Sequence, residues 1–258
     1  MTTQDPNNPY QAPAANVDAS AATSDNVWAF NDPQKVPAGR GWGWITEGWK
    51  LFTKNPLIWI VNVVIFFLIM IILSVIPIIS LVANIIQPIF TGGLMRGAHT
   101  LDTEGNLEVG HLFAGFNEKG GKLAIVGLLN LVAFMIFGAI IGIFFIGALG
   151  TASGGQDGLF TGIMLLLIPV AVIVAILVTM LFLFAPSLII LHDLDVFQAI
   201  KMSFIGCIRN IFPLIVYGII AVVLSVIAAI PVFLGFLVLV PVMVAAMYVA
   251  WKDIYTNA

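Results

Sequence analysis

The sequence predicts an all-α polytopic membrane protein with six transmembrane helices and three short amphipathic helices at the membrane surface. Three observations support this fold class. Apolar residues (AVILMFWYC) make up 60% of the 258 residues, whereas soluble domains contain roughly 45–50% even with glycine included. Charged residues make up only 9%, against about 25% in soluble proteins. The third observation is the spacing of those few charges along the chain.

Four long runs of the chain contain no Asp, Glu, Lys or Arg. They cover 55–95, 123–156, 158–192 and 210–251, and they are 41, 34, 35 and 42 residues long. One bilayer-spanning helix needs about 20 apolar residues, so the first and last runs can hold two helices each and each middle run holds one. Pro77 and Pro231 place the turns inside the two longest runs, because proline ends or begins a helix. The expected spans are 57–76, 78–98, 123–148, 160–191, 211–230 and 232–251.

The basic residues predict the orientation of these six spans. All ten Lys and Arg residues fall on one side of the membrane, and the turns on the other side contain only Asp157. Because the side rich in Lys and Arg faces the cytoplasm, both termini are expected there. The formal net charge of −3 and the lack of a basic run argue against a nucleic-acid partner.

The first 38 residues are expected to form a disordered cytoplasmic tail in front of a membrane domain at 39–258. Pro, Asn, Ala, Asp and Ser dominate this segment, which therefore cannot bury enough apolar surface to offset the entropy of ordering. It contains no apolar run, so no cleaved signal peptide is expected, and the first span serves as the targeting signal. Two places could bind a protein partner, one around Tyr10 and one at Trp28 and Phe30; the alternative is a passive tail.

A short amphipathic stretch precedes each pair of spans. Apolar residues recur at helical spacing in these stretches, which predicts helices lying in the membrane surface, at 44–54, 107–117 and 195–209. In the first stretch the expected apolar face consists of Trp44, Ile45, Gly48, Trp49 and Phe52. The first and third stretches each lead to an asparagine, Asn55 and Asn210, and then to a proline. These similarities indicate three copies of one unit in the same orientation, a parallel repeat; shared composition is the alternative.

Two sequence signatures resemble those of a known family. GRGWGWITEGWKLF lies within 36–56 and EVGHLFAGF covers 108–116. With Thr91-Gly-Gly-Leu-Met95 between them, they resemble a family of uncharacterised six-helix bacterial inner-membrane proteins, over about 36–256. The architecture is more distantly similar to the membrane domain attached to some glycerophosphodiester phosphodiesterases. The resemblance implies a fold and a location in the bacterial inner membrane, and no activity or catalytic residue is carried over.

The candidate site residues within the spans are amides, because no ionisable residue lies in mid-membrane, where ion-coupled pumps usually place one. The deepest are Asn62, Asn84, Gln87 and Asn130. They could line a polar path for a solute or a lipid head group, or they could form hydrogen bonds between helices. Near the end of the second span, Arg96 could contact a lipid phosphate, or it could be an ordinary interfacial anchor.

Three functions remain open on the sequence alone. The first is a non-enzymatic scaffold or regulatory membrane component that binds a partner through its tail or its interfacial helices, which the absence of charge within the spans and of a catalytic constellation favours. The second is a passive or lipid-directed permease that uses the four amides. The third is an enzyme acting on lipid, which requires His99, His111 and His192 to converge. No metal or cofactor is expected, and the sequence does not indicate an oligomeric state.

Overall fold

A computed structural model of the chain describes residues 30–75, 77–152 and 157–257, and this part contains helices and no strand. The proposed partner-binding places at Tyr10 and Trp28 lie outside the described residues. The helices are α2 (Arg40–Lys54), α3 (Pro56–Ser74), α4 (Pro77–Thr103), η1 (Val109–Phe113), α5 (Ala114–Ala152), α6 (Asp157–Phe182), α7 (Ala185–His192), α8 (Val196–Arg209), α9 (Ile211–Ala229) and α10 (Phe236–Tyr255).

The all-helical, polytopic fold predicted from the sequence is confirmed. Five stretches of the described residues are long and apolar enough to cross a membrane: Pro56–Ser74, Val109–Gly142, Leu167–His192, Ile211–Ala229 and Phe236–Tyr255. The second expected span, 78–98, is helical within α4 but is not among these five. Its hydropathy is lowered because Asn84, Gln87 and Arg96 lie along it.

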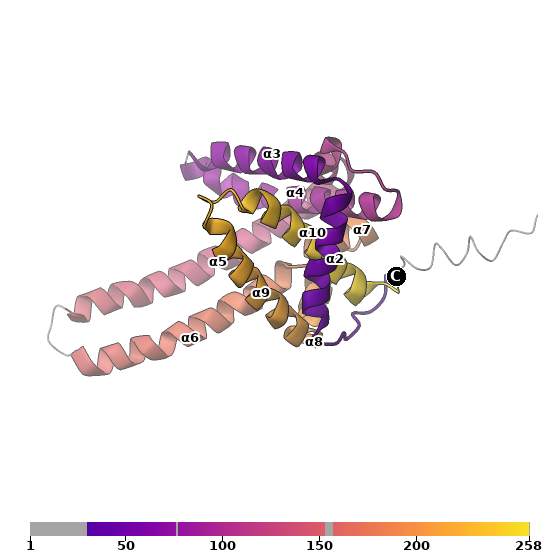
Figure 1. The fold of residues 1–258 in the computed structure, drawn as a ribbon. Coiled ribbons are helices and arrows are strands. Elements are labelled where there is room, and N and C mark those ends of the chain that lie inside the picture. Colours follow the sequence, from indigo (N-terminus) through magenta and orange to yellow (C-terminus); the bar gives the residue numbers. More distant parts are fainter. Residues whose placement is uncertain (1–29, 76, 153–156, 258) are drawn as a thin grey trace, which may run out of the picture.

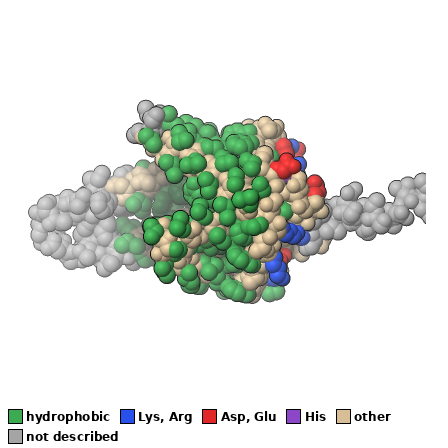
Figure 2. All heavy atoms as spheres, turned by 45° about the horizontal axis from the view of Figure 1, so that its top comes forward, with side chains coloured by type: hydrophobic (Ala, Val, Ile, Leu, Met, Phe, Trp, Pro, Cys, Tyr) green, Lys and Arg blue, Asp and Glu red, His purple; other side chains and the backbone are tan. Residues whose placement is uncertain are grey.

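The long helices form three hairpins, α3–α4, α5–α6 and α9–α10 (Figure 1). Most of the described large apolar residues of α5, α6 and α9 are exposed, as in Ile136, Ile173 and Val222, and in α3 only Trp59 and Val63 among such residues are buried. Figure 2 shows charged side chains gathered at one end of the visible face and apolar side chains over the rest of it. The exposed apolar band is the surface that lipid tails cover in a membrane protein. The α5–α6 hairpin extends well beyond the others (Figure 1).

Helix α2 lies across α10 at the charged end rather than alongside it (Figure 1). Its buried residues are Gly41, Trp44, Ile45, Gly48, Leu51 and Phe52, which recur at intervals of three and four as a single helix face requires. A Cβ atom on Gly48 would lie 2.6 Å from the backbone nitrogen of Ala246, so only glycine permits this close approach. Trp49, on the flank of this face, does not join the buried contact with α10 and is 50% exposed.

The other two expected surface helices have different outcomes. The third is confirmed as α8. The second, at 107–117, is instead the short 3₁₀ helix η1 followed by the first residues of α5, which bends where Lys119 leaves the helical region (φ −139°, ψ 26°). Gly93 of α4 packs so closely on η1 that an added Cβ would overlap the carbonyl oxygen of Leu112. The order of a short element and two long helices therefore recurs three times along the described chain.

The fourth expected span, 160–191, is broken into α6 and α7. Pro186 lies in the first turn of α7, where a proline is tolerated, but it cannot continue the preceding helix. The buried Ser203 of α8 binds both sides of the break. Its hydroxyl donates to the carbonyl of Met180 (2.8 Å) and accepts the N–H of Phe184 (3.0 Å). These bonds satisfy backbone groups that would otherwise be unpaired in an apolar setting.

Candidate functional site

The charged end of the molecule carries a docked N-terminal segment, residues 30–38. The backbone N–H groups of Asn31 and Gln34 donate to the carbonyls of Tyr255 and Ile254, at 2.9 and 2.8 Å. Phe30 stacks on the Tyr255 ring with a centroid distance of 6.4 Å. The segment is thus attached to the end of α10 by main-chain hydrogen bonds and one aromatic contact.

Asn210, at the junction of α8 and α9, is the main side-chain attachment for the docked segment. Its Oδ1 accepts the N–H of Val36 (2.8 Å), and its Nδ2 donates to the carbonyl of Gln34 (2.7 Å). The neighbouring Arg209 donates from Nη1 to the carbonyl of Pro33 (2.7 Å). Asn210 is fully buried, so its amide groups depend on these partners.

Residues 30–38 contact the bundle in the structure, although they lie within the segment expected to form a free tail. Composition suggested too little apolar surface for ordering, but most of this attachment is made by backbone groups, which every residue type provides. Phe30, which was expected to help bind a protein partner, contacts two rings of its own chain, Tyr255 and His192 (5.3 Å between the Phe30 and His192 ring centroids).

A network of ion pairs next to the docked segment joins α2, α4 and α10. Arg40 lies 2.5 Å from Asp253 and 2.7 Å from Glu47. Asp253 also accepts the indole N–H of the fully buried Trp44 (2.7 Å). The two carboxylates raise the pKa of the Arg40 guanidinium, chiefly through the hydrogen bond to Asp253. This network fixes the start of α2 to the end of α10.

Asp102, near the end of α4, is the second centre of this network. It accepts from the Lys252 ammonium (2.9 Å) and the Tyr248 hydroxyl (3.1 Å), and Lys54 lies 3.7 Å away. Burial alone would raise the pKa of Asp102, but the hydrogen bond and charge of Lys252 outweigh burial and lower it. The carboxylate therefore stays ionised at neutral pH. We call the hollow of about 330 Å³ around these residues the charged recess; it is lined by Arg40, Glu47, Lys50, Leu51, Lys54, Asp102, Val249, Lys252 and Asp253.

A second group of charges joins α5 to the end of α7. Asp193 lies 2.7 Å from the Lys119 ammonium and 2.9 Å from that of Lys122. Hydrogen bonds from these two lysines lower the pKa of Asp193 to about 2. These ion pairs tie the start of α5 to the segment between α7 and α8.

The structure brings only two of the four candidate amides together. Gln87 of α4 and Asn130 of α5 line one cavity of about 210 Å³, together with Thr91 and Thr179. Asn84 is exposed one turn from Gln87 and donates to the carbonyl of Ser80 in its own helix (3.0 Å).

Asn62, the fourth amide, is fully buried and lies outside this cavity. Its Nδ2 is 3.4 Å from the carbonyl of Glu108, and its Oδ1 has no hydrogen-bond partner among the described residues. A single path lined by all four amides is not formed, because Asn62 belongs to the contact between α3 and the loop that leads into η1.

Arg96 is paired within the chain rather than left open for a phosphate. Its guanidinium contacts both carboxylate oxygens of Glu118, at 3.2 Å from Nε and 3.1 Å from Nη2. A lipid phosphate would have to compete with this two-point contact. The sequence does not reveal the pair, since 22 positions separate the two residues and they lie on different helices.

Two of the three histidines lie against the same tryptophan, and the third caps a helix. His99 and His192 both pack against the indole of Trp251, with ring centroids 6.2 and 5.1 Å away. His111 instead accepts the backbone N–H of Glu108 (3.0 Å) as part of a cap at the start of η1. Within 30–75, 77–152 and 157–257, no group of three or more His, Cys, Asp or Glu side chains is placed to hold a metal ion.

Sequence reasoning missed the role of Asn210 and the cation Lys50, which lines the charged recess on the exposed side of α2. A signal for Asn210 existed, because it ends α8 just as Asn55 ends α2. Lys50 has no sequence signal beyond its place on an amphipathic helix. The chain was compared with models of known protein families, with curated proteins and with solved structures, and it matches none of them.

Proposed function

We propose that this protein is a non-enzymatic component of the bacterial inner membrane that presents its N-terminal residues to a protein partner at the cytoplasmic surface. The observation that supports this proposal best is the attachment of the docked segment to Asn210 and to the end of α10. Residues 1–29 come directly before this attachment in the chain. A partner bound to them would be held against the charged end of the bundle.

Extraction into lipid nanodiscs tests the proposal. We expect one protein to remain with the full chain in near-stoichiometric amount, as measured by quantitative mass spectrometry. The matched control replaces residues 1–29 with a Gly/Ser linker of equal length and keeps 30–258 unchanged. Loss of the retained protein in this control supports the proposal. The same set of retained proteins in both samples contradicts it.

We further propose that both termini face the cytoplasm. The distribution of Lys and Arg supports this orientation. A cysteine in place of Glu104, which is exposed after α4, is then expected to react with an impermeant thiol reagent only in permeabilised cells. A cysteine in place of Ile230, which is 77% exposed between α9 and α10, is expected to react in intact cells. The opposite pattern would show the reverse orientation.

A passive or lipid-directed permease is the alternative function that a specific observation favours. Gln87 and Asn130 share a cavity with two threonines between α4, α5 and α6. In this alternative, Gln87→Leu and Asn130→Leu would abolish retention of a bound solute or lipid in nanodiscs, and Asn62→Leu would not. An unchanged set of bound small molecules in the first two variants would argue against the permease.

A further inference from the structure

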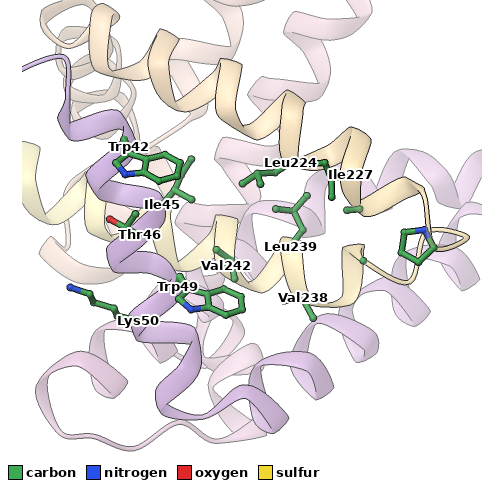
Figure 3. A pocket seen from close by; sticks show the side chains of 13 residues that line it. Trp42, Ile45, Thr46, Trp49, Lys50, Leu224, Ile227, Val238, Leu239 and Val242 are labelled. Carbon is green, nitrogen blue, oxygen red and sulfur yellow. The ribbon is translucent and has the colours of Figure 1, made fainter.

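An apolar groove of about 590 Å³ lies between α2, α9 and α10. Leu224, Ile227, Val238 and Leu239 form its floor and walls, and the flank of α2 closes one end (Figure 3). Its volume lies within the roughly 300–1,000 Å³ of typical small-molecule sites. Because α9 carries part of the exposed apolar band, a lipid tail can enter the groove sideways from the bilayer.

The end of the groove at α2 has the features of a membrane interface. Trp42 and Trp49 lie one above the other along α2, and they are 56% and 50% exposed. Tryptophan is enriched at the level of lipid head groups, where its ring and its N–H meet different environments. Lys50 extends from α2 away from the apolar side chains (Figure 3). Lysine near a membrane surface places its stem along apolar groups and its ammonium toward the polar side.

Lys50 is the residue that belongs to both hollows, because it lines the apolar groove and also the charged recess. The other cations of the recess are matched with acids: Arg40 with Asp253 and Glu47, and Lys54 and Lys252 with Asp102. Lys50 forms no ion pair with any described residue. The unpaired Lys50 ammonium therefore lies at the boundary between the apolar groove and the charged recess.

A second groove provides an internal comparison. It has a volume of about 420 Å³, lies between α6, α9 and α10, and is lined by similar apolar side chains that include Leu214 and Ile215. Neither Lys nor Arg is among its lining residues. The two grooves thus offer similar contacts to a lipid tail and differ in the charge available to a head group.

We propose that the apolar groove binds one anionic phospholipid, with an acyl chain between α9 and α10 and the phosphate at Lys50. The apolar lining explains why the ligand carries a tail, and the unpaired ammonium explains why its head group is anionic. The second groove, by this reasoning, holds lipid without regard to head-group charge. The proposal concerns the α2 side of the molecule and is independent of any partner bound by residues 1–29.

Native mass spectrometry of the full chain, released from nanodiscs of equal parts phosphatidylglycerol and phosphatidylcholine, tests the head-group contact. One Lys near an anionic surface contributes about 1 kcal/mol, so Lys50→Gln is expected to lower the ratio of retained phosphatidylglycerol to phosphatidylcholine about fivefold. Lys50→Arg is expected to keep the ratio. The matched control is Lys201→Gln, which removes an exposed cation of α8 that lies outside the groove. A ratio that is equal in Lys50→Gln and wild type would overturn the proposal.

Filling each groove tests the position of the tail. Leu224 and Leu214 are both half-buried leucines of α9, one in each groove. Leu224→Trp is expected to remove the retained phosphatidylglycerol, whereas Leu214→Trp is expected to leave it in place. Both variants are first checked for an unchanged elution volume in size-exclusion chromatography. Removal of the lipid by Leu214→Trp alone would overturn the assignment to the α2 groove.

Soluble glycerol 3-phosphate separates a lipid from a free anion in the charged recess. It has the phosphate but no tail, so at millimolar concentration it is expected to leave phosphatidylglycerol bound to the wild-type protein. Complete displacement by glycerol 3-phosphate would show that the recess binds the anion without the groove, and the proposal would fail.

Discussion

Replacement of Asn210 by alanine is expected to release the docked segment without unfolding the bundle. The change removes the acceptor of the Val36 N–H and the donor to the Gln34 carbonyl. A protein hydrogen bond contributes about 0.5–1.5 kcal/mol net, so the two together contribute about 2 kcal/mol to docking. At a factor of ten for each 1.4 kcal/mol, the undocked population is expected to rise about 30-fold.

Limited trypsin digestion measures this population directly. Lys35 is the first Lys or Arg of the chain, it is exposed, and it lies between two residues that Asn210 holds. When opening is fast relative to cleavage, the cleavage rate follows the open population. The Asn210→Ala variant should therefore lose its first 35 residues about 30-fold faster than the wild type, as followed by intact-mass spectrometry.

Asn55→Ala is the matched control for this experiment. Asn55 ends α2 as Asn210 ends α8, but its Nδ2 approaches the carbonyl of Leu107 (3.5 Å), far along the chain from the docked segment. Cleavage after Lys35 is expected to stay at the wild-type rate in this variant. Equal rates in wild type and Asn210→Ala would refute the reasoning, because the asparagine would then contribute nothing to holding the segment.

Three further predictions concern the packing and charge of the bundle. Ser203→Ala is expected to lower the free energy of unfolding in detergent by about 1–3 kcal/mol, because the buried N–H of Phe184 loses its acceptor. The control is Ser225→Ala, which removes only a hydrogen bond to the carbonyl four residues earlier in its own helix. In the same unfolding assay it should change the free energy little. Asp102 has a lowered pKa in the folded protein, so its stabilising effect is present above about pH 4 and is lost as the pH falls further. The Asp102→Asn variant should therefore melt at a lower temperature than the wild type at pH 7. Between pH 6 and pH 3 its melting temperature should fall less than that of the wild type. Gly48→Ala is expected to push α2 off α10, which increased iodide quenching of tryptophan fluorescence would reveal; unchanged quenching would show that the contact adjusts.

The helices were predictable because the bilayer imposes its own constraint on the sequence. The expected span 211–230 and α9 at Ile211–Ala229 agree within one residue, since Arg209 cannot move into the hydrocarbon and Pro231 marks the turn inside the apolar run. The break between α6 and α7 is also predictable from a local feature, Pro186. The hydrogen bonds of Ser203 to both sides of this break are not predictable, because the sequence does not show which groups a serine on an amphipathic helix will contact.

The candidate site was less predictable because it depends on contacts between distant residues. The docked segment is held largely by main-chain bonds, which leave no pattern in the side chains of 30–38. Arg96 has the right chemistry to bind a phosphate, but it forms an ion pair with Glu118 instead. The amides divide in the same way: Gln87 and Asn130 meet only because α4 and α5 pack together, whereas Asn62 points into another contact. Helix length and polarity are local properties, and these pairings are not.

The length of the α5–α6 hairpin bears on the kind of membrane that can hold this protein. From its bend at Lys119 to Ala152, α5 is about 50 Å long at 1.5 Å per residue, whereas the hydrocarbon core of a bilayer is about 30 Å thick. The shorter helices α3 and α9, with 19 residues each, match that core at about 29 Å. One molecule thus contains helices that fit two different thicknesses. The surrounding bilayer must stretch around the hairpin, or the hairpin must lean away from its neighbours, and either response costs a fraction of a kcal/mol per ångström of mismatch. A thicker region of membrane therefore reduces the mismatch at the hairpin and increases it at α3 and α9.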